Sequence, residues 1–238
     1  MKRTAVRFVS ALIGAALALT ASAAAAEQVE ISSGVYVTKK SFPAPADEQP
    51  FYGFREKTPQ ELKADKDLLD ALAKKGYAKS YAFNRAMANG WLAYKNGKLD
   101  LATRRFNQAY LIDPTQSAVL HAFAVVAQVR FRDDDYAEEL FKTGAAMDNR
   151  RPGFMADYGR FLLQTGKGRE AMPIMEEAVK EAPKDADAWS NLAIARLYAG
   201  MRQSACYAAF KSSSLNPPAN TARDLKIFAA KAKCDVRL

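Results

Sequence analysis

The chain has 238 residues, of which 49% are hydrophobic and 26% charged, and its formal net charge is +9. This length suggests one or two domains, and the composition excludes a disordered, collagen-like or cysteine-stapled protein. The sequence contains one histidine, His121. Histidine-rich metal sites are therefore excluded, and a catalytic triad or dyad that needs histidine has a single possible base.

The first 26 residues have the pattern of a secretory signal peptide. Lys2, Arg3 and Arg7 form a basic start, and an apolar run of about a dozen residues follows, which is too short to span a bilayer comfortably. Residues 21–26 offer several A-x-A cleavage registers. We expect cleavage near Ala26 and an exported chain, periplasmic or secreted, with an uncleaved anchor as the alternative.

The excess of positive charge lies at the C-terminal end. Residues 196–238 carry eight basic and two acidic side chains, whereas residues 27–80 and 81–195 each carry equal numbers of both. An exported protein meets anionic lipid, cell-wall polymer or acidic proteins rather than nucleic acid. We therefore expect a basic end that either contacts an anionic partner or is a solvated polar surface, and it includes Arg223, Lys226, Lys231 and Lys233.

Three windows of the chain, 83–116, 152–185 and 186–219, carry small and apolar residues at the same offsets. Each window begins with apolar residues spaced i, i+3, i+4 and i+7, which predicts an amphipathic helix. A glycine then stands where a helix needs a left-handed C-terminal residue. These glycines are Gly97, Gly166 and Gly200.

A second helix follows at once in each window, so the two helices are expected to be antiparallel neighbours. A proline ends this second helix, at Pro114, Pro183 and Pro217. Small residues on both helices should let them approach closely. On the first helices these are Gly90, Gly159 and Ala193, and on the second helices they are Ala102, Ala171 and Ala205.

The three windows together resemble the tetratricopeptide repeat (TPR) family, whose pattern recurs every 34 residues or so. The matching residues are, in turn, Gly90, Ala102, Phe106, Ala109 and Pro114; Gly159, Ala171, Ala178 and Pro183; and Trp189, Leu192, Ala205 and Pro217. The resemblance implies an all-α, TPR-like right-handed solenoid of antiparallel helix pairs with N- and C-terminal capping helices. It covers four repeats, at 83–116, 117–151, 152–185 and 186–218.

Residues 117–151 depart from the pattern and are interpreted as a degenerate repeat. Leu120 and Phe123 keep the first helix, and Tyr136–Met147 is expected to form the second. The connection over residues 131–135 contains no glycine and is expected to be longer than in the other repeats. Its Asp133-Asp134-Asp135 run is interpreted as a solvated loop and helix N-cap rather than a cation site, because no glycine-punctuated calcium loop follows.

Both ends of the repeat array carry signals for capping helices. Residues 58–76 begin with Thr58, Pro59 and Glu61, the elements of a capping box, and the apolar face of this helix contains Leu68, Leu69 and Leu72. Residues 219–238 form the C-terminal cap, with Leu225, Phe228 and Ala229 on one face.

Residues 27–57 are predicted to form an extended N-terminal arm, because prolines 43, 45 and 50 hold the chain extended. Its aromatic residues Phe51, Tyr52 and Phe54 are expected to attach it to the helices. An alternative is that the arm occupies the groove of the solenoid and competes with a ligand.

The family resemblance also places the two cysteines. In a TPR-like stack the C-terminal cap runs antiparallel to the preceding helix, which brings Cys234 beside Cys206. We therefore predict a disulfide in an exported protein, with two thiols as the alternative.

No P-loop, H-E-x-x-H, G-x-S-x-G or dinucleotide fingerprint is present in the sequence. We expect no enzyme, cofactor or metal, and a non-catalytic scaffold or adaptor of the cell envelope that binds a peptide or protein in its concave groove. By family register the groove is lined by Met87, Trp91, Tyr94, Lys95, His121, Gln128, Arg160, Gln164 and Tyr198. Two alternatives remain, a binder of anionic lipid or cell-wall polymer through the basic end and, more weakly, an envelope hydrolase. Trp91 and Tyr94 could instead pack against the arm.

Overall fold

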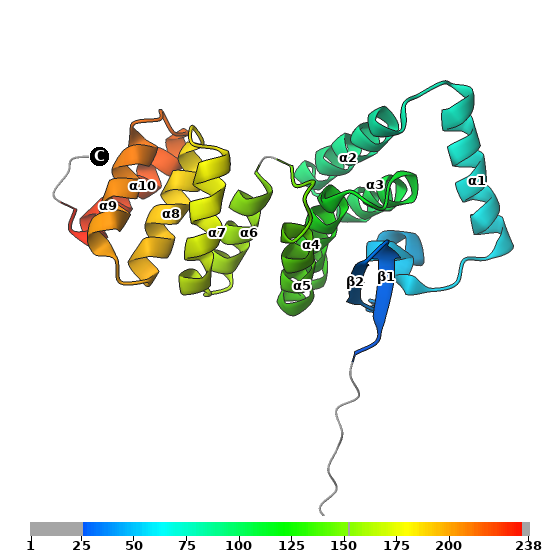
Figure 1. Ribbon diagram of the computed structural model, residues 1–238, viewed down its shortest axis with the longest axis horizontal. Helices are drawn as coiled ribbons and strands as arrows, with labels where there is room; N and C mark the ends of the chain where they lie inside the picture. Colours follow the sequence, from blue (N-terminus) through cyan, green and yellow to red (C-terminus); the bar gives the residue numbers. More distant parts are fainter. Residues whose placement is uncertain (1–25, 152, 235–238) are drawn as a thin grey trace, which may run out of the picture.

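A computed structural model describes residues 26–151 and 153–234 (Figure 1). The expected signal peptide falls almost wholly on residues 1–25 and so lies outside the described residues. Within the described ranges, ten α-helices follow a two-stranded hairpin and two short 3-10 helices. None of these helices has the length and apolar character that crossing a membrane requires.

The elements in chain order are β1 (Gln28–Ser32), β2 (Val35–Thr38), η1 (Ala46–Glu48), η2 (Pro50–Phe54), α1 (Pro59–Lys74), α2 (Lys79–Lys95), α3 (Leu99–Ile112), α4 (Ser117–Phe131), α5 (Asp134–Ala145), α6 (Phe154–Gln164), α7 (Gly168–Glu181), α8 (Ala186–Tyr198), α9 (Arg202–Ser213) and α10 (Ala219–Ala232).

The helices from α2 to α9 form four antiparallel pairs, α2 with α3, α4 with α5, α6 with α7 and α8 with α9, and α10 packs on α8 and α9. The pairs stand in a row along the long axis of the molecule (Figure 1). This is the all-α, TPR-like solenoid that the sequence predicts. The expected left-handed glycines are present, with φ of +71° at Gly97, +78° at Gly166 and +79° at Gly200.

The degenerate repeat is more regular than its sequence indicates. Helix α4 runs to Phe131 and α5 begins at Asp134, so the expected longer connection is wrong. Arg132 takes the left-handed conformation, with φ of +57°, where the other repeats have glycine. Asp133 then caps α5, because its side chain accepts a hydrogen bond of 3.0 Å from the backbone N–H of Tyr136.

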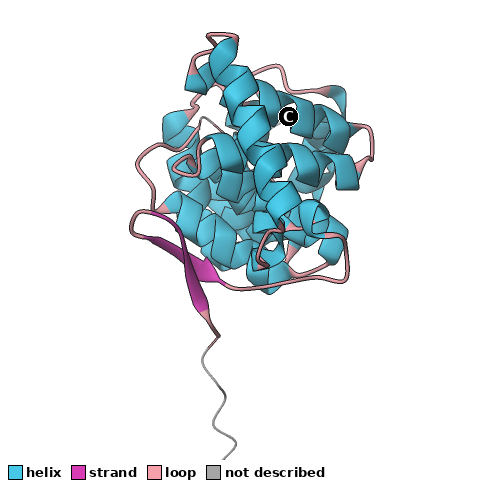
Figure 2. Ribbon diagram, turned by 90° about the vertical axis from the view of Figure 1, so that its right-hand side faces the viewer, coloured by secondary structure: helices cyan, strands magenta, loops and turns pink. Residues whose placement is uncertain are grey.

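The N-terminal arm is folded rather than extended, which corrects the sequence prediction for residues 27–57. Val29 of β1 pairs with Val37 of β2 in an antiparallel hairpin, and Figure 2 shows this hairpin beside the helices. The arm packs on α3, α4 and α5. Phe51 is only 4% exposed and contacts Tyr110 and Phe123 at ring-centroid distances of 5.2 and 4.6 Å.

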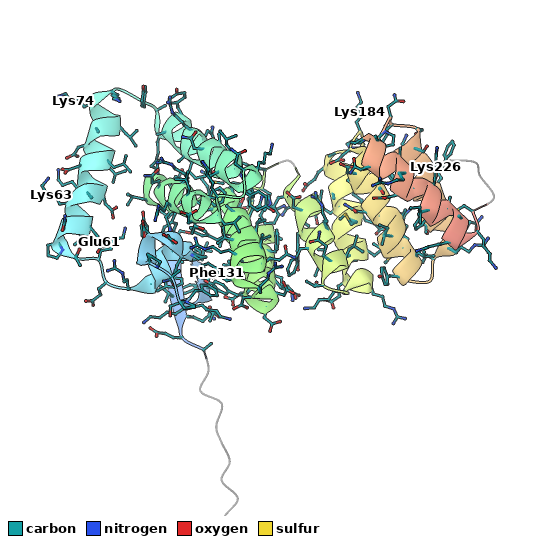
Figure 3. All side chains as sticks on the ribbon, turned by 180° about the vertical axis from the view of Figure 1, so that it is seen from behind. Glu61, Lys63, Lys74, Phe131, Lys184 and Lys226 are labelled. Atoms are coloured by element: carbon teal, nitrogen blue, oxygen red, sulfur yellow. A yellow bond between two sulfur atoms is a disulfide. The ribbon has the colours of Figure 1, made fainter. Side chains whose placement is uncertain are left out.

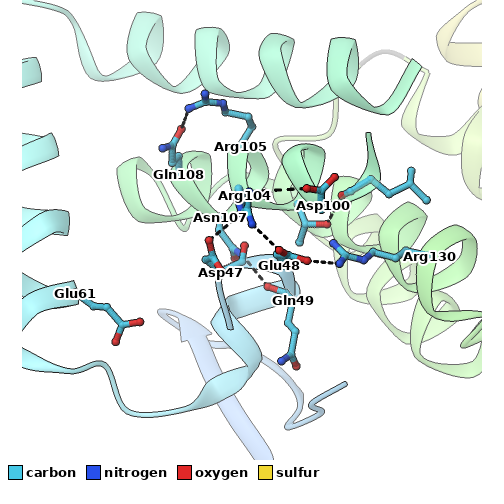
Figure 4. A network of polar contacts seen from close by, with 12 residues as sticks. Asp47, Glu48, Gln49, Glu61, Asp100, Arg104, Arg105, Asn107, Gln108 and Arg130 are labelled. Atoms are coloured by element: carbon cyan, nitrogen blue, oxygen red, sulfur yellow. Dashed lines mark hydrogen bonds and ion pairs between the residues drawn. The ribbon is translucent and has the colours of Figure 1, made fainter. Parts of the chain in front are cut away.

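A polar network attaches the arm to the solenoid (Figure 4). The carboxylate of Glu48 bridges the guanidinium groups of Arg104 in α3 and Arg130 in α4. The side-chain amide of Asn107 in α3 donates hydrogen bonds of 2.7 and 2.9 Å to the carbonyl oxygens of Gln49 and Asp47. These contacts satisfy polar groups that the arm would otherwise bury without partners.

Helix α1, the predicted N-terminal cap, covers the first repeat only loosely. Its capping box is present, because the Glu61 N–H donates to Thr58 Oγ1 at 3.3 Å and the Thr58 N–H donates to Glu61 Oε2 at 2.8 Å. However, no residue of α1 is buried, and Leu69 is 38% exposed. The helix stands at the N-terminal end of the array (Figure 1), and its half-buried Leu68 and Leu72 line a crevice with Ala86 of α2 and Ile112 of α3.

The disulfide is present, and so is the C-terminal cap as far as residue 234, since residues 235–238 of the predicted cap lie outside the described residues. Leu225 of α10 is buried, and Cys206 of α9 is bonded to Cys234 just after α10, with their Cα atoms 5.6 Å apart. The guanidinium of Arg202 also donates to the carbonyl oxygen of Ala232 at 2.7 Å. The last helix is thus held to α9 near its C-terminal end by a covalent bond and a hydrogen bond.

Candidate functional site

A cavity of about 710 Å³ opens on the face of the solenoid formed by α2, α4 and α6. We call it the concave groove. Its lining residues are Trp91, Tyr94, Lys95, His121, Val125, Gln128, Val129, Arg132, Phe141, Asp157, Arg160, Phe161 and Gln164. Helices of three successive repeats therefore share one site, which lies at the middle of the chain rather than at either end.

One wall of the groove is aromatic. The Trp91 ring packs edge-to-face on Tyr94 at 5.7 Å and on Phe106 at 5.0 Å between ring centroids, and it lies 5.2 Å from the His121 ring. All of these partners belong to the helix pairs. The alternative that Trp91 and Tyr94 pack against the N-terminal arm is therefore wrong, and so is the alternative that the arm fills the groove, since no arm residue lines it.

The floor of the groove is an aromatic cluster that joins the second repeat to the third. Phe141 of α5 stacks on Tyr158 of α6 at 5.3 Å and contacts Phe161 at 5.2 Å. Phe154 reaches α5 because Gly144 has no side chain, and a Cβ there would lie 2.7 Å from the Phe154 ring. The floor is thus a packed, rigid surface, of the kind that favours preorganised binding.

The polar groups of the groove include one carboxylate. Asp157 Oδ2 lies 3.0 Å from His121 Nε2, and Asp157 Oδ1 accepts a hydrogen bond of 2.6 Å from Arg160 Nη2. Burial acts to raise the pKa of Asp157, but the His121 imidazole and the Arg160 guanidinium outweigh it and hold that pKa below its usual range. Asp157 is therefore ionised at neutral pH.

The remaining charges of the groove are positive. Lys95 and Arg132 are exposed, and no carboxylate of the described residues forms an ion pair with either of them. Across the cavity, the Gln128 amide donates to Gln164 Oε1 at 3.3 Å. The groove thus combines aromatic rings, paired amides and cations, and its Trp, Tyr and Arg side chains are of the types that dominate binding energies at protein interfaces.

The structure brings together seven of the nine residues expected in the groove, which are Trp91, Tyr94, Lys95, His121, Gln128, Arg160 and Gln164. Met87 does not line it, because Met87 is 1% exposed and faces the core with Phe83. Tyr198 is 56% exposed but lies in a separate crevice beside Gly168. The residues expected in the middle of the groove therefore line the cavity, whereas those expected at its margins, Met87 and Tyr198, do not.

Sequence reasoning missed four polar or aromatic members of the lining, Arg132, Phe141, Asp157 and Phe161. Asp157 stands one helical turn before Arg160, so its i, i+3 spacing was a usable signal. Arg132 had no such signal, because the connection that holds it was expected to be longer and solvated. Phe141 comes from a second helix, and the family register assigns the groove to first helices.

The residues of the basic end remain on the surface. Arg223, Lys226, Lys231 and Lys233 are all exposed, and Lys226 projects from α10 in Figure 3. A second cavity, of about 650 Å³, lies beside the disulfide and is lined in part by Arg202, Tyr207 and Phe210. Among the described residues, no three His, Cys, Asp or Glu side chains come together as a metal site would require.

The fold and the groove define the class of this molecule, a helical-repeat protein with a cavity lined by helices of three successive repeats. Residues 133–197 match the sequence profile of the tetratricopeptide repeat family. This match runs from the start of α5 almost to the end of α8, so it includes part of the degenerate repeat. No curated protein sequence matches the chain.

Several solved structures are similar to this chain in fold. PilF of Pseudomonas aeruginosa is 23% identical, with 65% of this chain and 71% of PilF aligned at a TM-score of 0.57. PilW, a type IV pilus biogenesis factor, is 19% identical over 73% of this chain and 77% of its own, with a TM-score of 0.55. YrrB, a TPR protein with a peptide-binding site, is 15% identical over 67% and 86%, with a TM-score of 0.50. These similarities establish the fold.

Proposed function

We propose that this protein is a non-catalytic scaffold of the cell envelope that binds a segment of a protein partner in the concave groove. The observation that carries the proposal is the groove itself, an open cavity lined by Trp91, Tyr94 and Lys95 of α2 and by Arg160 of α6. Rigid aromatic rings beside charged groups favour recognition of side chains. The volume, about 710 Å³, falls within the range of about 300–1,000 Å³ typical of binding pockets.

The position of the N-terminal arm supports a groove that is open to a partner. Its buried side chain Phe51 and its bridging carboxylate Glu48 contact α3 and α4 away from the groove lining. An export signal in the sequence supports a location outside the cytoplasm, and YrrB offers an example of the same fold in a protein with a peptide-binding site.

Photo-crosslinking in the native cell tests this function. One variant carries p-benzoylphenylalanine in place of Tyr94, in the groove, and a matched variant carries it in place of Lys226, on the exposed face of α10. We expect a discrete protein adduct from the Tyr94 probe and none from the Lys226 probe. The partner is then identified by mass spectrometry of the adduct.

Two outcomes would contradict the proposal. Adducts from the Lys226 probe alone, lost at high salt, would assign the protein to anionic envelope components, because screening weakens contacts between exposed charges. The absence of an adduct at both positions, with both variants folded and exported, would show that the groove holds no protein partner.

A further inference from the structure

We infer that the partner segment is acidic and carries at least one bulky apolar side chain, an inference that rests on the proposed function. Its carboxylates would contact Lys95, Arg132 and Arg160, and its apolar side chain would lie on the aromatic wall formed by Trp91 and Tyr94. Three features of the groove carry this inference, its charge balance, the placement of its cations and the position of its aromatic rings.

The first feature is a charge imbalance in the groove. Three cations line it, Lys95, Arg132 and Arg160, against the single carboxylate of Asp157. That carboxylate already contacts both His121 and Arg160. The Lys, Arg and Asp side chains of the lining therefore give an excess of two positive charges, and a partner that brings carboxylates would be attracted to it electrostatically.

The second feature is the distribution of the cations over the fold. Lys95 ends α2, Arg132 lies in the connection between α4 and α5, and Arg160 belongs to α6. The three cations thus come from three different elements around one cavity of about 710 Å³, and an extended segment with spaced carboxylates could contact all three. The placement thus favours a peptide segment over a small anion.

The third feature is the half-buried state of the aromatic wall. Trp91 and Tyr94 are packed against each other and against Phe106, yet both keep part of their surface in the cavity. The rings are held in place before a partner arrives, so a bulky apolar side chain could bind without further ordering of the wall. Val125 and Val129 extend this apolar surface along α4.

Charge alone would not select the groove, because the basic end also carries exposed cations. Arg223, Lys226, Lys231 and Lys233 lie on or just after α10, far from α2 along the solenoid (Figure 1). An acidic peptide that recognised charge only would bind there as well. The matched control for any groove variant is therefore Lys226→Glu, which changes the same charge at the other site.

The experiment measures fluorescence anisotropy of three labelled Gly/Ser peptides of twelve residues, mixed with the full chain lacking its signal segment. The first probe carries two Glu flanking one Phe, the second replaces both Glu by Lys, and the third replaces Phe by Ala. We expect the first probe to bind at least about tenfold more tightly than the other two, because each lacks one of the two recognised features.

Variants of the protein assign the binding to the groove. Lys95→Glu and Arg132→Asn should each weaken binding of the first probe by about fivefold or more, whereas Lys226→Glu should change it by less than about twofold. Asparagine is chosen at position 132 because it tolerates the left-handed backbone there. Lys95 and Arg132 are exposed, and circular dichroism verifies that both variants fold.

The inference and the proposed function fail in different ways. The Tyr94 probe could still give its adduct in cells while Lys95→Glu does not reduce that adduct and the first peptide does not compete with it. The groove would then bind a partner of other chemistry, and this inference would be overturned. Equal weakening by Lys226→Glu would also overturn it, since the peptide would then bind at the basic end. If the Tyr94 probe gives no adduct in a chain that is otherwise wild-type, the proposed function itself is contradicted.

Discussion

Individual small residues set the distance between the paired helices. A Cβ on Gly90 of α2 would lie 2.3 Å from Cε1 of Phe106 in α3, and a Cβ on Gly159 of α6 would lie 2.6 Å from Cε of Met175 in α7. Both contacts are shorter than van der Waals packing permits. The first and second helices of these repeats therefore touch directly through the glycine backbone.

We expect Gly90→Ala to destabilise the protein by about 1–3 kcal/mol, as overpacking of a filled core does. The Phe106 ring is fully buried and packs on Trp91, so it has no room to move away. Gly159→Ala should lower the free energy of unfolding by less than half of that amount, because the flexible Met175 side chain can adopt another rotamer. Urea unfolding measured by circular dichroism compares the two variants.

Gly97→Ala is a useful control, since its new Cβ would meet nothing within 4 Å but the backbone has φ of +71°. Its loss of stability would report backbone strain alone, about 1 kcal/mol. A Gly159→Ala variant that is destabilised as much as Gly90→Ala would show that the Met175 site is as rigid as the Phe106 ring.

At the scale of elements, α1 differs from every other helix because its stability depends on its own ends. It buries none of its residues, so tertiary packing contributes little to it, whereas packing provides most of the stability of typical protein helices. The capping box of Thr58 and Glu61, together with an ion pair between Arg55 and Glu61, holds its first turn. Isolated helices of this length are marginal in water.

We predict that acid unravels α1 before the solenoid. Hydrogen bonds from Arg55 and Thr58 lower the pKa of Glu61 from its ordinary value of 4.5 to about 2. Because the folded pKa is depressed, the stabilisation is fully present above about pH 4.5 and is lost as the pH falls toward 2. Hydrogen exchange of the amides of residues 59–74, followed across this range, measures the change.

Glu61→Gln should reproduce this effect at neutral pH, with faster exchange in residues 59–74 and unchanged exchange in α2 to α9. Glu56→Gln is the matched control, because Glu56 lies outside the capping box. If Glu61→Gln leaves the exchange of α1 unchanged, the negative charge of Glu61 does not stabilise the helix, because a glutamine side chain can still accept the hydrogen bond from the Thr58 N–H.

At the scale of the whole molecule, stability is distributed along the row of helix pairs. Each pair contacts mainly its neighbours, so changes at one end should propagate weakly to the other. The concave groove lies in the middle, between α2 and α6, and the disulfide lies at the far end, between Cys206 and Cys234. Binding and covalent stabilisation are therefore separated in space.

We expect the Cys206→Ser/Cys234→Ser double variant to lose about 3 kcal/mol of stability at the C-terminal end, the loop-closure value for a bridge of this length. The loop spans 28 residues. Amides of α10 should exchange first, while peptide binding in the groove should change by less than about twofold. The wild-type chain measured with and without dithiothreitol tests the same effect of the disulfide. A large loss of peptide binding in the groove would show that the groove and the C-terminal end are coupled.

Local features of this protein could be predicted from its sequence because they depend on residues three or four positions apart. The helices, the left-handed Gly166, the capping box at Thr58 and the pairing of successive helices all follow from such spacings. The register implied by the resemblance to tetratricopeptide repeats then placed most of the residues around the groove, among them Trp91, His121 and Arg160. The resemblance to tetratricopeptide repeats supplied the antiparallel arrangement that brings Cys206 beside Cys234.

Other features depend on contacts between residues far apart in the chain, and the tertiary structure alone decided them. Phe51, Tyr52 and Phe54 all have left-handed backbone, a conformation that is unfavourable for residues other than glycine. The burial of Phe51 and the hydrogen bonds between Tyr52 and Asn107 stabilise it. The path of the arm follows from those contacts and from the bridge at Glu48. The sequence by itself determined which residues form helices and how they repeat, because that information is local. Packing between distant surfaces decided the rest, namely the position of the arm, the margins of the groove and the degree to which α1 is covered.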